Sequence, residues 1–375
     1  MKLQTIQLPF FFGVQPNELN GGKPQIMPFK YGFNTQLKLY YQESYADLNE
    51  VLKKVYEEGS MLNGEMDFSD GGHQGKAAMD FILKNISSAK FRSVLEIGCG
   101  NGFLLKELYK HGFDCVGLEP GPQVDELKNE FNKIKIIKDF FPSKSIQQKF
   151  DVIIHYNVIE HIQNPKEFLL EQKKYLNDGG KIIFGMPNCE PNLKNGDISI
   201  FMHEHFNYFT RESLVLLANS IKMEVEHIEF AANDGMIFCS FINKYNIPNS
   251  IEYWLKYNWD EFPLKIENSL SILNTEISKF EEQDVAIYCP KRALNALSII
   301  NKLSCRLVDD TPSMYNNYLP SLQKKIENFN DLIKMPPKLI IIFSRTFGKE
   351  ILIKCNSNEA LSNTRILNIE NFDQL

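Results

Sequence analysis

The sequence lacks three features that would mark a specialised class of protein. Its seven cysteines include no C-x-x-C pair and are odd in number, which argues against a disulfide framework and a zinc knuckle and favours reduced core residues. No apolar run reaches membrane-spanning length, and the short run at 8–14 contains a proline and is interpreted as a buried strand. The net charge of -6 argues against a nucleic-acid backbone as substrate. We expect a cytoplasmic protein with a small-molecule substrate and no nucleic-acid or membrane partner.

A chain of 375 residues predicts two or three domains, and the 43% hydrophobic content is ordinary for globular proteins. Residues 1–60 form a turn-rich N-terminal extension with a helix from Ser44 to Gly59, which serves either as a packing layer or as a lid over a site. Residues 61–245 and residues 246–375 are predicted to form two further parts. The oligomeric state is not indicated.

The most informative stretch is the apolar run of residues 94–97, which is followed by alternating glycines and then by helical spacing. This pattern predicts a strand, a tight turn and a helix. Gly98, Gly100 and Gly102 are spaced G-x-G-x-G, with Glu96 two residues ahead. Glycines let a ligand approach the backbone N–H groups of such a turn, so the stretch is interpreted as a nucleotide cradle.

This motif resembles motif I of class I S-adenosylmethionine (SAM) dependent methyltransferases, and three later segments match the same family in order. A second strand ends in a carboxylate at Glu119, where an acid can bind ribose hydroxyls. A short strand at 134–137 precedes an acid and an aromatic residue, and the strand at 150–156 ends at Asn157. The resemblance implies SAM as the cofactor, with these binding residues: Glu96, Gly98, Cys99, Gly100, Gly102, Glu119, Pro120, Asp139, Phe140 and Asn157.

Strands alternate with helices as far as residue 186 and are followed by an antiparallel pair at 223–230 and 236–243, with a hairpin signal at 233–235. This order implies an α/β fold with the seven-stranded, Rossmann-like class I methyltransferase sheet. A helix at 251–283 and a further strand–helix rhythm from residue 285 predict a smaller C-terminal Rossmann-like α/β domain.

The second informative stretch is the polar run Met202-His203-Glu204-His205-Phe206-Asn207-Tyr208, which follows the fifth strand. A histidine is a suitable base near neutral pH, so His205 is the preferred general base and Glu204 its orienting carboxylate or a substrate contact. The helix after Thr210 starts with Thr-x-x-Ser, which lacks the acid of a full capping box.

Together with the C-terminal domain, this run resembles the sugar C-methyltransferases that act on nucleotide-linked deoxysugars. The resemblance implies that His205 deprotonates carbon 3 of a 4-keto sugar before methylation. It also assigns catalytic positions to Glu204, His161 and Tyr208. The chain departs from that family in four ways. Residues 1–60 contain no cysteine for an N-terminal zinc module, and Met202 replaces a tyrosine. A further family tyrosine upstream of the first strand has no counterpart, and Cys289-Pro290-Lys291-Arg292 stands in place of a glycine-rich turn.

Several alternatives remain beside this interpretation. His203 and His205 could ligate a metal, but no third ligand is evident, so no metal is expected. The histidines of the polar run could be purely structural, and His155 is better explained as a packing residue. His73 could approach the substrate or could simply be exposed. Methylation of oxygen or nitrogen on a sugar or another small metabolite is the alternative reaction, and a non-catalytic SAM-binding protein is the alternative of another class. Lys291, Arg292 and Arg345 are expected to be solvated charges rather than phosphate ligands.

Overall fold

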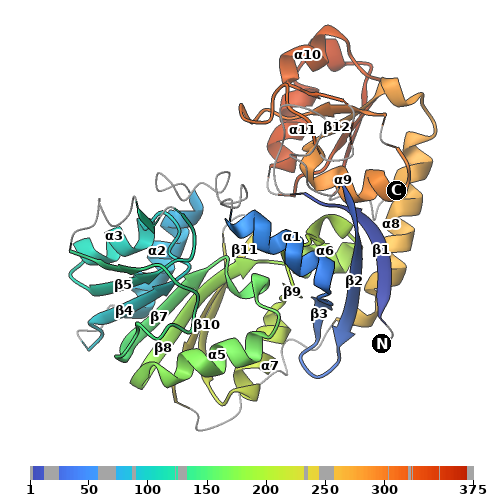
Figure 1. Cartoon of the computed structure of the whole chain (residues 1–375). Helices are drawn as coiled ribbons and strands as arrows, with labels where there is room; N and C mark the ends of the chain where they lie inside the picture. The colour runs from blue at the N-terminus through green and yellow to red at the C-terminus, as the bar shows by residue number, and fades with distance from the viewer. Residues whose placement is uncertain are drawn as a thin grey trace. The chain divides into compact units, whose positions relative to one another are not determined.

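The structure is a computed structural model that describes residues 3–11, 25–57, 73–86, 90–122, 124–125, 133–231, 235–244, 257–302, 304–319, 322, 324–345 and 347–369. The described chain divides into two compact units, each drawn from separate stretches of sequence (Figure 1). The first unit comprises residues 32–188 and 204–257, and the second comprises residues 3–31, 189–203 and 258 onward. The three-part division at residues 60 and 245 stays a prediction.

The first unit is built on a seven-stranded sheet with the order β10-β11-β8-β7-β4-β5-β6. The strands from β4 to β8 are parallel, whereas β11 is antiparallel to both of its neighbours. This arrangement confirms the predicted α/β sheet with its antiparallel pair. The strands are β4 (Ser93–Ile97), β5 (Asp114–Leu118), β6 (Lys135–Ile137), β7 (Phe150–Tyr156), β8 (Leu176–Pro187), β10 (Glu224–Phe230) and β11 (Met236–Ile242).

Helices cover both faces of this sheet, because the buried strands are apolar on both sides. The helices α2 (His73–Ile86) and α3 (Phe103–Lys110) lie on one face, and α5 (Pro165–Lys174) and α7 (Arg211–Ser220) lie on the other (Figure 1). Each face of the sheet has its own hydrophobic core, and alternate residues of β7 contribute to one or the other. Val152 and Ile154 pack with α2 and α3, while Ile153 packs with α5 and α7. Side chains that alternate in this way are the signature of a pleated strand.

Two shorter elements of the first unit precede the sheet in sequence. The helix predicted to start at Ser44 is α1 (Ala46–Glu57), and its predicted end at Gly59 lies outside the described residues. The strand β3 (Leu39–Gln42) pairs antiparallel with β9 (Asn207–Tyr208), which places Tyr40 opposite Tyr208. The hairpin turn expected at 233–235 lies outside the described residues except for Gly235.

The start of α7 differs from the sequence prediction. The side chain of Thr210 accepts a hydrogen bond from the backbone N–H of Ser213, and the Ser213 hydroxyl accepts one from the backbone N–H of Thr210. This is a complete reciprocal capping box. The prediction was wrong because it required an acid at the third position, whereas a buried serine hydroxyl at hydrogen-bond distance performs the same task.

The second unit contains a parallel five-stranded sheet with the order β14-β13-β12-β15-β16, which confirms the smaller C-terminal Rossmann-like α/β domain. Its strands are β12 (Val285–Tyr288), β13 (Arg306–Val308), β14 (Ile326–Glu327), β15 (Leu339–Ile342) and β16 (Arg365–Asn368). Its helices are α6 (Glu190–Asn195), α8 (Phe262–Ile277), α9 (Pro290–Ile299), α10 (Phe329–Lys334) and α11 (Gly348–Asn356).

The N-terminal strands complete the description of the chain. The strand β1 (Gln4–Pro9) pairs antiparallel with the first part of β2 (Ile26–Asn34). It shares only Leu8 and Pro9 with the buried strand expected at 8–14; Leu8 and Phe10 are buried, and residues 12–14 lie outside the described residues. All seven cysteines are free, and all but Cys289 are buried, as expected of reduced core residues. None of the described helices combines the length and the apolar character needed to cross a bilayer.

His155 lies near the C-terminal end of β7 and is a packing residue, as predicted. Its ring stacks on Phe184 with centroids 4.9 Å apart and meets the edge of Phe168 at 5.4 Å. Neither ring nitrogen has a hydrogen-bond partner among the described residues. Burial lowers the pKa of His155 from 6.5 to about 3, so the ring is neutral at physiological pH.

The buried ring of His155 is expected to make the fold sensitive to acid. Because the folded pKa lies below the unfolded one, the unfolded chain takes up more protons between these values, and stability falls by up to about 1.4 kcal/mol per pH unit as the pH drops below about 6.5. His155→Phe should reduce this loss, measured as urea midpoints between about pH 7 and pH 4. The exposed His111→Phe is the control, and an unchanged slope in His155→Phe would contradict the prediction.

Candidate functional site

The candidate site lies where parallel strands of the seven-stranded sheet end side by side. Strand β4 pairs with β7 and with β5, with Glu96 opposite Ile154 on one side and Gly117 on the other. The loops that follow these strands therefore leave the sheet at the same edge, which is where α/β sheets bind their ligands. The predicted cofactor residues are distributed over these loops.

The glycine-rich turn after β4 has the backbone conformation that its glycines predict. Gly98, Gly100 and Gly102 have φ values of 70°, 52° and 74°, in the left-handed region that residues with a Cβ atom rarely adopt. A Cβ atom added to Gly100 would meet nothing within 4 Å, so the backbone there borders open space. A Cβ atom on Gly98 would come within 2.6 Å of the Val158 side chain, so the turn packs against the loop that follows β7.

Two buried carboxylates flank this turn. Burial, and secondarily the nearby Glu119, raises the pKa of Glu96 well above its usual value. Glu96 Oε2 is buried and has no hydrogen-bond partner among the described residues, so a cationic group would satisfy it. Glu119 accepts hydrogen bonds from the backbone N–H groups of Gly100 at 3.0 Å and Gly121 at 2.8 Å. An open strip of backbone beside an unsatisfied carboxylate fits the aminoalkyl part of SAM.

The remaining predicted cofactor residues occupy the same edge of the sheet. Asp139 accepts hydrogen bonds from the Phe140 backbone N–H and the Ser143 hydroxyl, both at 2.8 Å. Phe140 is 66% exposed, which is unusual for so large an apolar ring and leaves its face available to a flat ligand. Asn157 has a φ of 53° directly after β7. Cys99 is buried within the turn, and Pro120 follows β5.

Two histidines from distant parts of the sequence meet beside this edge. His161 ends a single 3₁₀ turn, Ile159–His161, just after β7, and His205 belongs to the polar run before β9. Their ring centroids are 4.8 Å apart in an edge-to-face arrangement. The sequence proposed both residues separately as catalytic candidates, and the fold places them in direct contact.

Hydrogen bonds fasten the polar run to the 3₁₀ turn. The backbone N–H of Phe206 donates to the Glu160 carbonyl at 2.6 Å, and the Asn207 side-chain amide donates to the Ile162 carbonyl at 2.6 Å. The Tyr208 hydroxyl donates to the His205 carbonyl at 3.0 Å. Because Tyr208 is fully buried, this bond holds the backbone of His205 in place, and a direct contact between Tyr208 and a substrate stays a prediction.

The protonation states of this cluster follow from its burial. His161 Nδ1 lies 2.9 Å from the Glu204 carbonyl, which can only accept, so Nδ1 carries the proton and Nε2 carries the lone pair. Burial lowers the pKa of His161 from 6.5 to about 4. Burial raises the pKa of Glu160 from 4.5 to about 8. The Glu204 carboxylate is also buried, whereas His205 is half-buried.

Other histidines singled out from the sequence lie apart from this cluster. His203 is buried in the second unit, where its ring lies 5.4 Å from Phe10 and 5.5 Å from Phe29. Its Nε2 lies 3.4 Å from the Met27 carbonyl, and burial lowers its pKa to about 4. The alternation of His203 and His205 therefore does not form a metal pair. His73 starts α2, and its side chain lies outside the described part of the structure.

Two residues of the site were missed by sequence reasoning. Glu160, which directly precedes the catalytic candidate His161, and Val158, two residues earlier, were given no role. The adjacency of the two ionisable residues after a buried strand was the available signal for Glu160. No signal marked Val158, because its contact with Gly98 exists only in the folded chain.

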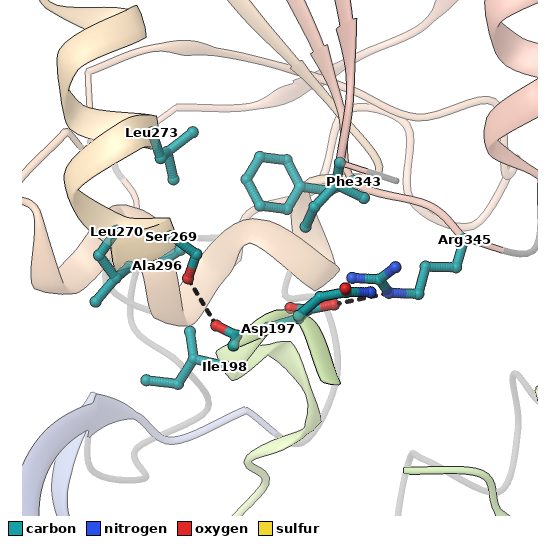
Figure 2. A pocket seen from close by; sticks show the side chains of 11 residues that line it. Asp197, Ile198, Ser269, Leu270, Leu273, Ala296, Phe343 and Arg345 are labelled. Atoms are coloured by element: carbon teal, nitrogen blue, oxygen red, sulfur yellow. Dashed lines mark hydrogen bonds and ion pairs between the residues drawn. The ribbon is translucent and has the colours of Figure 1, made fainter. Parts of the chain in front are cut away.

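The second unit has a small cavity of its own between α8, α9 and the segment after α6 (Figure 2). Arg345 Nε lies 3.3 Å from Asp197 Oδ2 at one side of it, and the Ser269 hydroxyl donates to the Gly196 carbonyl at 2.7 Å (Figure 2). The Arg345 side chain is only 21% exposed. The expectation of a solvated charge was wrong for Arg345, because folding places a buried carboxylate beside it.

Comparison with known proteins identifies the first unit. Residues 72–228 match a family profile described as a methyltransferase domain, which covers less than half of the chain. An uncharacterised methyltransferase of Alkaliphilus oremlandii is 26% identical over 144 residues, 37% of this chain and 66% of that protein. A tRNA U34 carboxymethyltransferase of Hydrogenovibrio crunogenus is 26% identical over 115 residues, 28% of this chain and 35% of that protein.

Among solved structures, the 1,6-didemethyltoxoflavin N1-methyltransferase of Burkholderia thailandensis aligns with a TM-score of 0.42 and 10% identity. The alignment covers 58% of this chain and 99% of that one. For the two sequence relatives named above, the match covers only 66% and 35% of the relative's own length. The sheet order, the glycine cradle and the family profile agree on one point: the chain contains a class I SAM-dependent methyltransferase domain, of which residues 72–228 match the profile.

Proposed function

We propose that the chain is an enzyme that transfers a methyl group from SAM to a carbohydrate-like small molecule. The preferred reaction is C-methylation of a nucleotide-linked keto sugar, with His205 as the general base. The observation that carries the proposal is the meeting of His161 and His205 at the sheet edge that also holds the glycine cradle. When bound, SAM supplies an electrophilic methyl group. The protein must hold the substrate in position and remove its proton.

The cofactor half of the proposal is supported by the chemistry of the cradle. Glu96 offers a buried carboxylate oxygen without a hydrogen-bond partner in the described structure, which suits the ammonium of the methionine part. The backbone at Gly100 borders open space, which lets a flat or extended ligand lie along it. Glu119 is proposed to bind the ribose, and Asp139 with Phe140 to bind the adenine.

The base half is supported by how the two imidazoles are held. A half-buried His205 keeps access to solvent and substrate, whereas His161 is fixed as the tautomer whose Nε2 lone pair points away from the Glu204 carbonyl. We propose that His205 accepts the substrate proton and that His161 accepts a hydrogen bond from a substrate hydroxyl. Glu204 orients His161 through its carbonyl, and Tyr208 positions His205 through its hydroxyl.

The substrate class rests on the resemblance of the polar run and on the second Rossmann-like sheet, which suits a nucleotide-linked substrate. The test begins with calorimetric titration of SAM into the full chain, followed by mass analysis of a panel of keto and hydroxy nucleotide sugars. We expect SAM to bind and one keto sugar to gain the mass of a methylene unit. Exchange of a sugar proton for deuterium without SAM would support carbon chemistry with His205 as base.

The other outcomes separate the alternatives. A methylated hydroxy or amino sugar without deuterium exchange would replace C-methylation by O- or N-methylation. SAM binding without any methylated product would favour a non-catalytic SAM-binding protein. Absence of SAM binding would overturn the proposal as a whole.

A further inference from the structure

We propose that Glu160, His161 and His205 form a binding site for one divalent transition-metal ion, of which Zn²⁺ and Co²⁺ are suitable probes. One ligand atom from each of the three side chains lies within 4.8 Å of the other two. The sequence pairs His205 with His203 by spacing, but the fold brings it to His161 and adds a carboxylate. The inference rests on the same site as the proposed methyl transfer and concerns what else that site binds.

The donor set is the first argument. Two imidazole nitrogens and one carboxylate oxygen are ligands that Zn²⁺ and other first-row divalent ions share, and three protein ligands leave a position open for another oxygen. Metal–ligand bonds of about 2.1 Å require donors no more than about 4 Å apart, so the observed separations need side-chain adjustments of roughly an ångström. Both loops that carry the donors are held by the backbone bond between Phe206 and Glu160.

The orientation of His161 is the second argument. A metal-bound histidine usually donates its other ring N–H to a carbonyl or carboxylate, which fixes the tautomer and aims the lone pair at the ion. His161 Nδ1 donates to the Glu204 carbonyl at 2.9 Å in this way, so Nε2 is the ring nitrogen that would ligate the ion. The supporting contact is therefore built into the fold.

The burial of Glu160 is the third argument. This residue is 2% exposed, and its Oε2 atom has no hydrogen-bond partner among the described residues. Leaving a carboxylate in such a place is costly unless a cation or donor satisfies it. A metal ion held between Glu160 and the two histidines would satisfy this oxygen.

Occupation of the site has a chemical consequence. A metal ion takes the lone pair with which His205 would accept a proton, so ion binding and general-base action of His205 exclude each other. The open coordination position would instead hold an oxygen of the substrate. Metal-free and metal-loaded protein should therefore differ in rate.

The test uses full-length protein stripped of metal with a chelator. We expect calorimetric titration with Zn²⁺ to give one ion per chain, and Co²⁺ to give a visible absorption spectrum upon binding. Glu160→Gln and His205→Ala should each weaken binding at least about tenfold. His111→Ala is the matched control, because His111 is an exposed histidine outside the cluster, and its binding should equal that of the wild type.

The results test the metal site separately from the proposed methyl transfer. No binding at about 100 µM ion, or equal binding by the wild type, Glu160→Gln and His205→Ala, would overturn the metal site and leave the SAM titration unaffected. Binding that slows methyl transfer would support both the site and His205 as base. Binding that is required for methyl transfer would support the site and overturn the assignment of His205 as base.

Discussion

Gly100→Val is expected to abolish SAM binding, with at least a hundredfold loss of affinity. The backbone at Gly100 has a φ of 52° and borders open space, so a valine side chain would stand where the ligand approaches the chain. A hundredfold loss corresponds to about 2.7 kcal/mol, which steric exclusion from a close-fitting cradle easily supplies. Calorimetric titration with SAM measures the change.

The matched control for this variant is Gly112→Val. Gly112 has a φ of 85°, a Cβ atom there would also meet nothing within 4 Å, and the residue lies in the turn after α3. Both variants therefore carry a similar conformational cost of about 1–2 kcal/mol for a left-handed residue with a side chain. If Gly100→Val kept the SAM affinity of Gly112→Val, the cradle would not be the cofactor site.

His205→Ala is expected to keep the SAM affinity and to lower kcat at least about a hundredfold, because general-base catalysis contributes factors of this size. The side chain is half-buried and is not among the residues proposed to hold SAM. Steady-state kinetics on the substrate found in the panel, together with a SAM titration, separate the two effects. Added imidazole should restore part of the rate by replacing the lost base.

The exposed His111→Ala variant controls for the loss of a histidine elsewhere. A parallel loss of SAM affinity in His205→Ala would indicate that the loop supports the cradle rather than the reaction. An unchanged kcat would reduce His205 to a structural residue.

The sheet could be predicted from the sequence because its signals are local. The apolar run at 94–97, the glycine turn and the later strands each carry their own periodicity, and their order along the chain specifies the topology. The buried imidazole of His155 was also foreseen, since it sits inside an apolar strand. The reciprocal cap at Thr210 was missed because a rule about acidic residues excluded a serine that fulfils the same geometry.

The candidate site could be predicted only in part, because it is formed by contacts between residues that are far apart in the sequence. His161 and His205 could each be singled out, but their contact depends on a loop return of more than forty residues. Glu160 became noticeable only when its burial and its unsatisfied oxygen were known. Arg345 was misjudged in the same way, because its partner Asp197 is distant in sequence. Pairwise contacts across the fold carry this information, and a single sequence does not display them.

The hydrogen bonds that join the polar run to the 3₁₀ turn bear on how this site can be re-engineered. Residues 204–208 are held at the Glu160 and Ile162 carbonyls and in turn fix the ring of His161. A chimera that exchanges this run alone would place other donors at the Glu160 and Ile162 carbonyls. It would also remove the Glu204 carbonyl that holds the ring of His161. Residues 159–162 and 204–208 therefore make up one transferable module, and a graft intended to change substrate choice should carry both segments together.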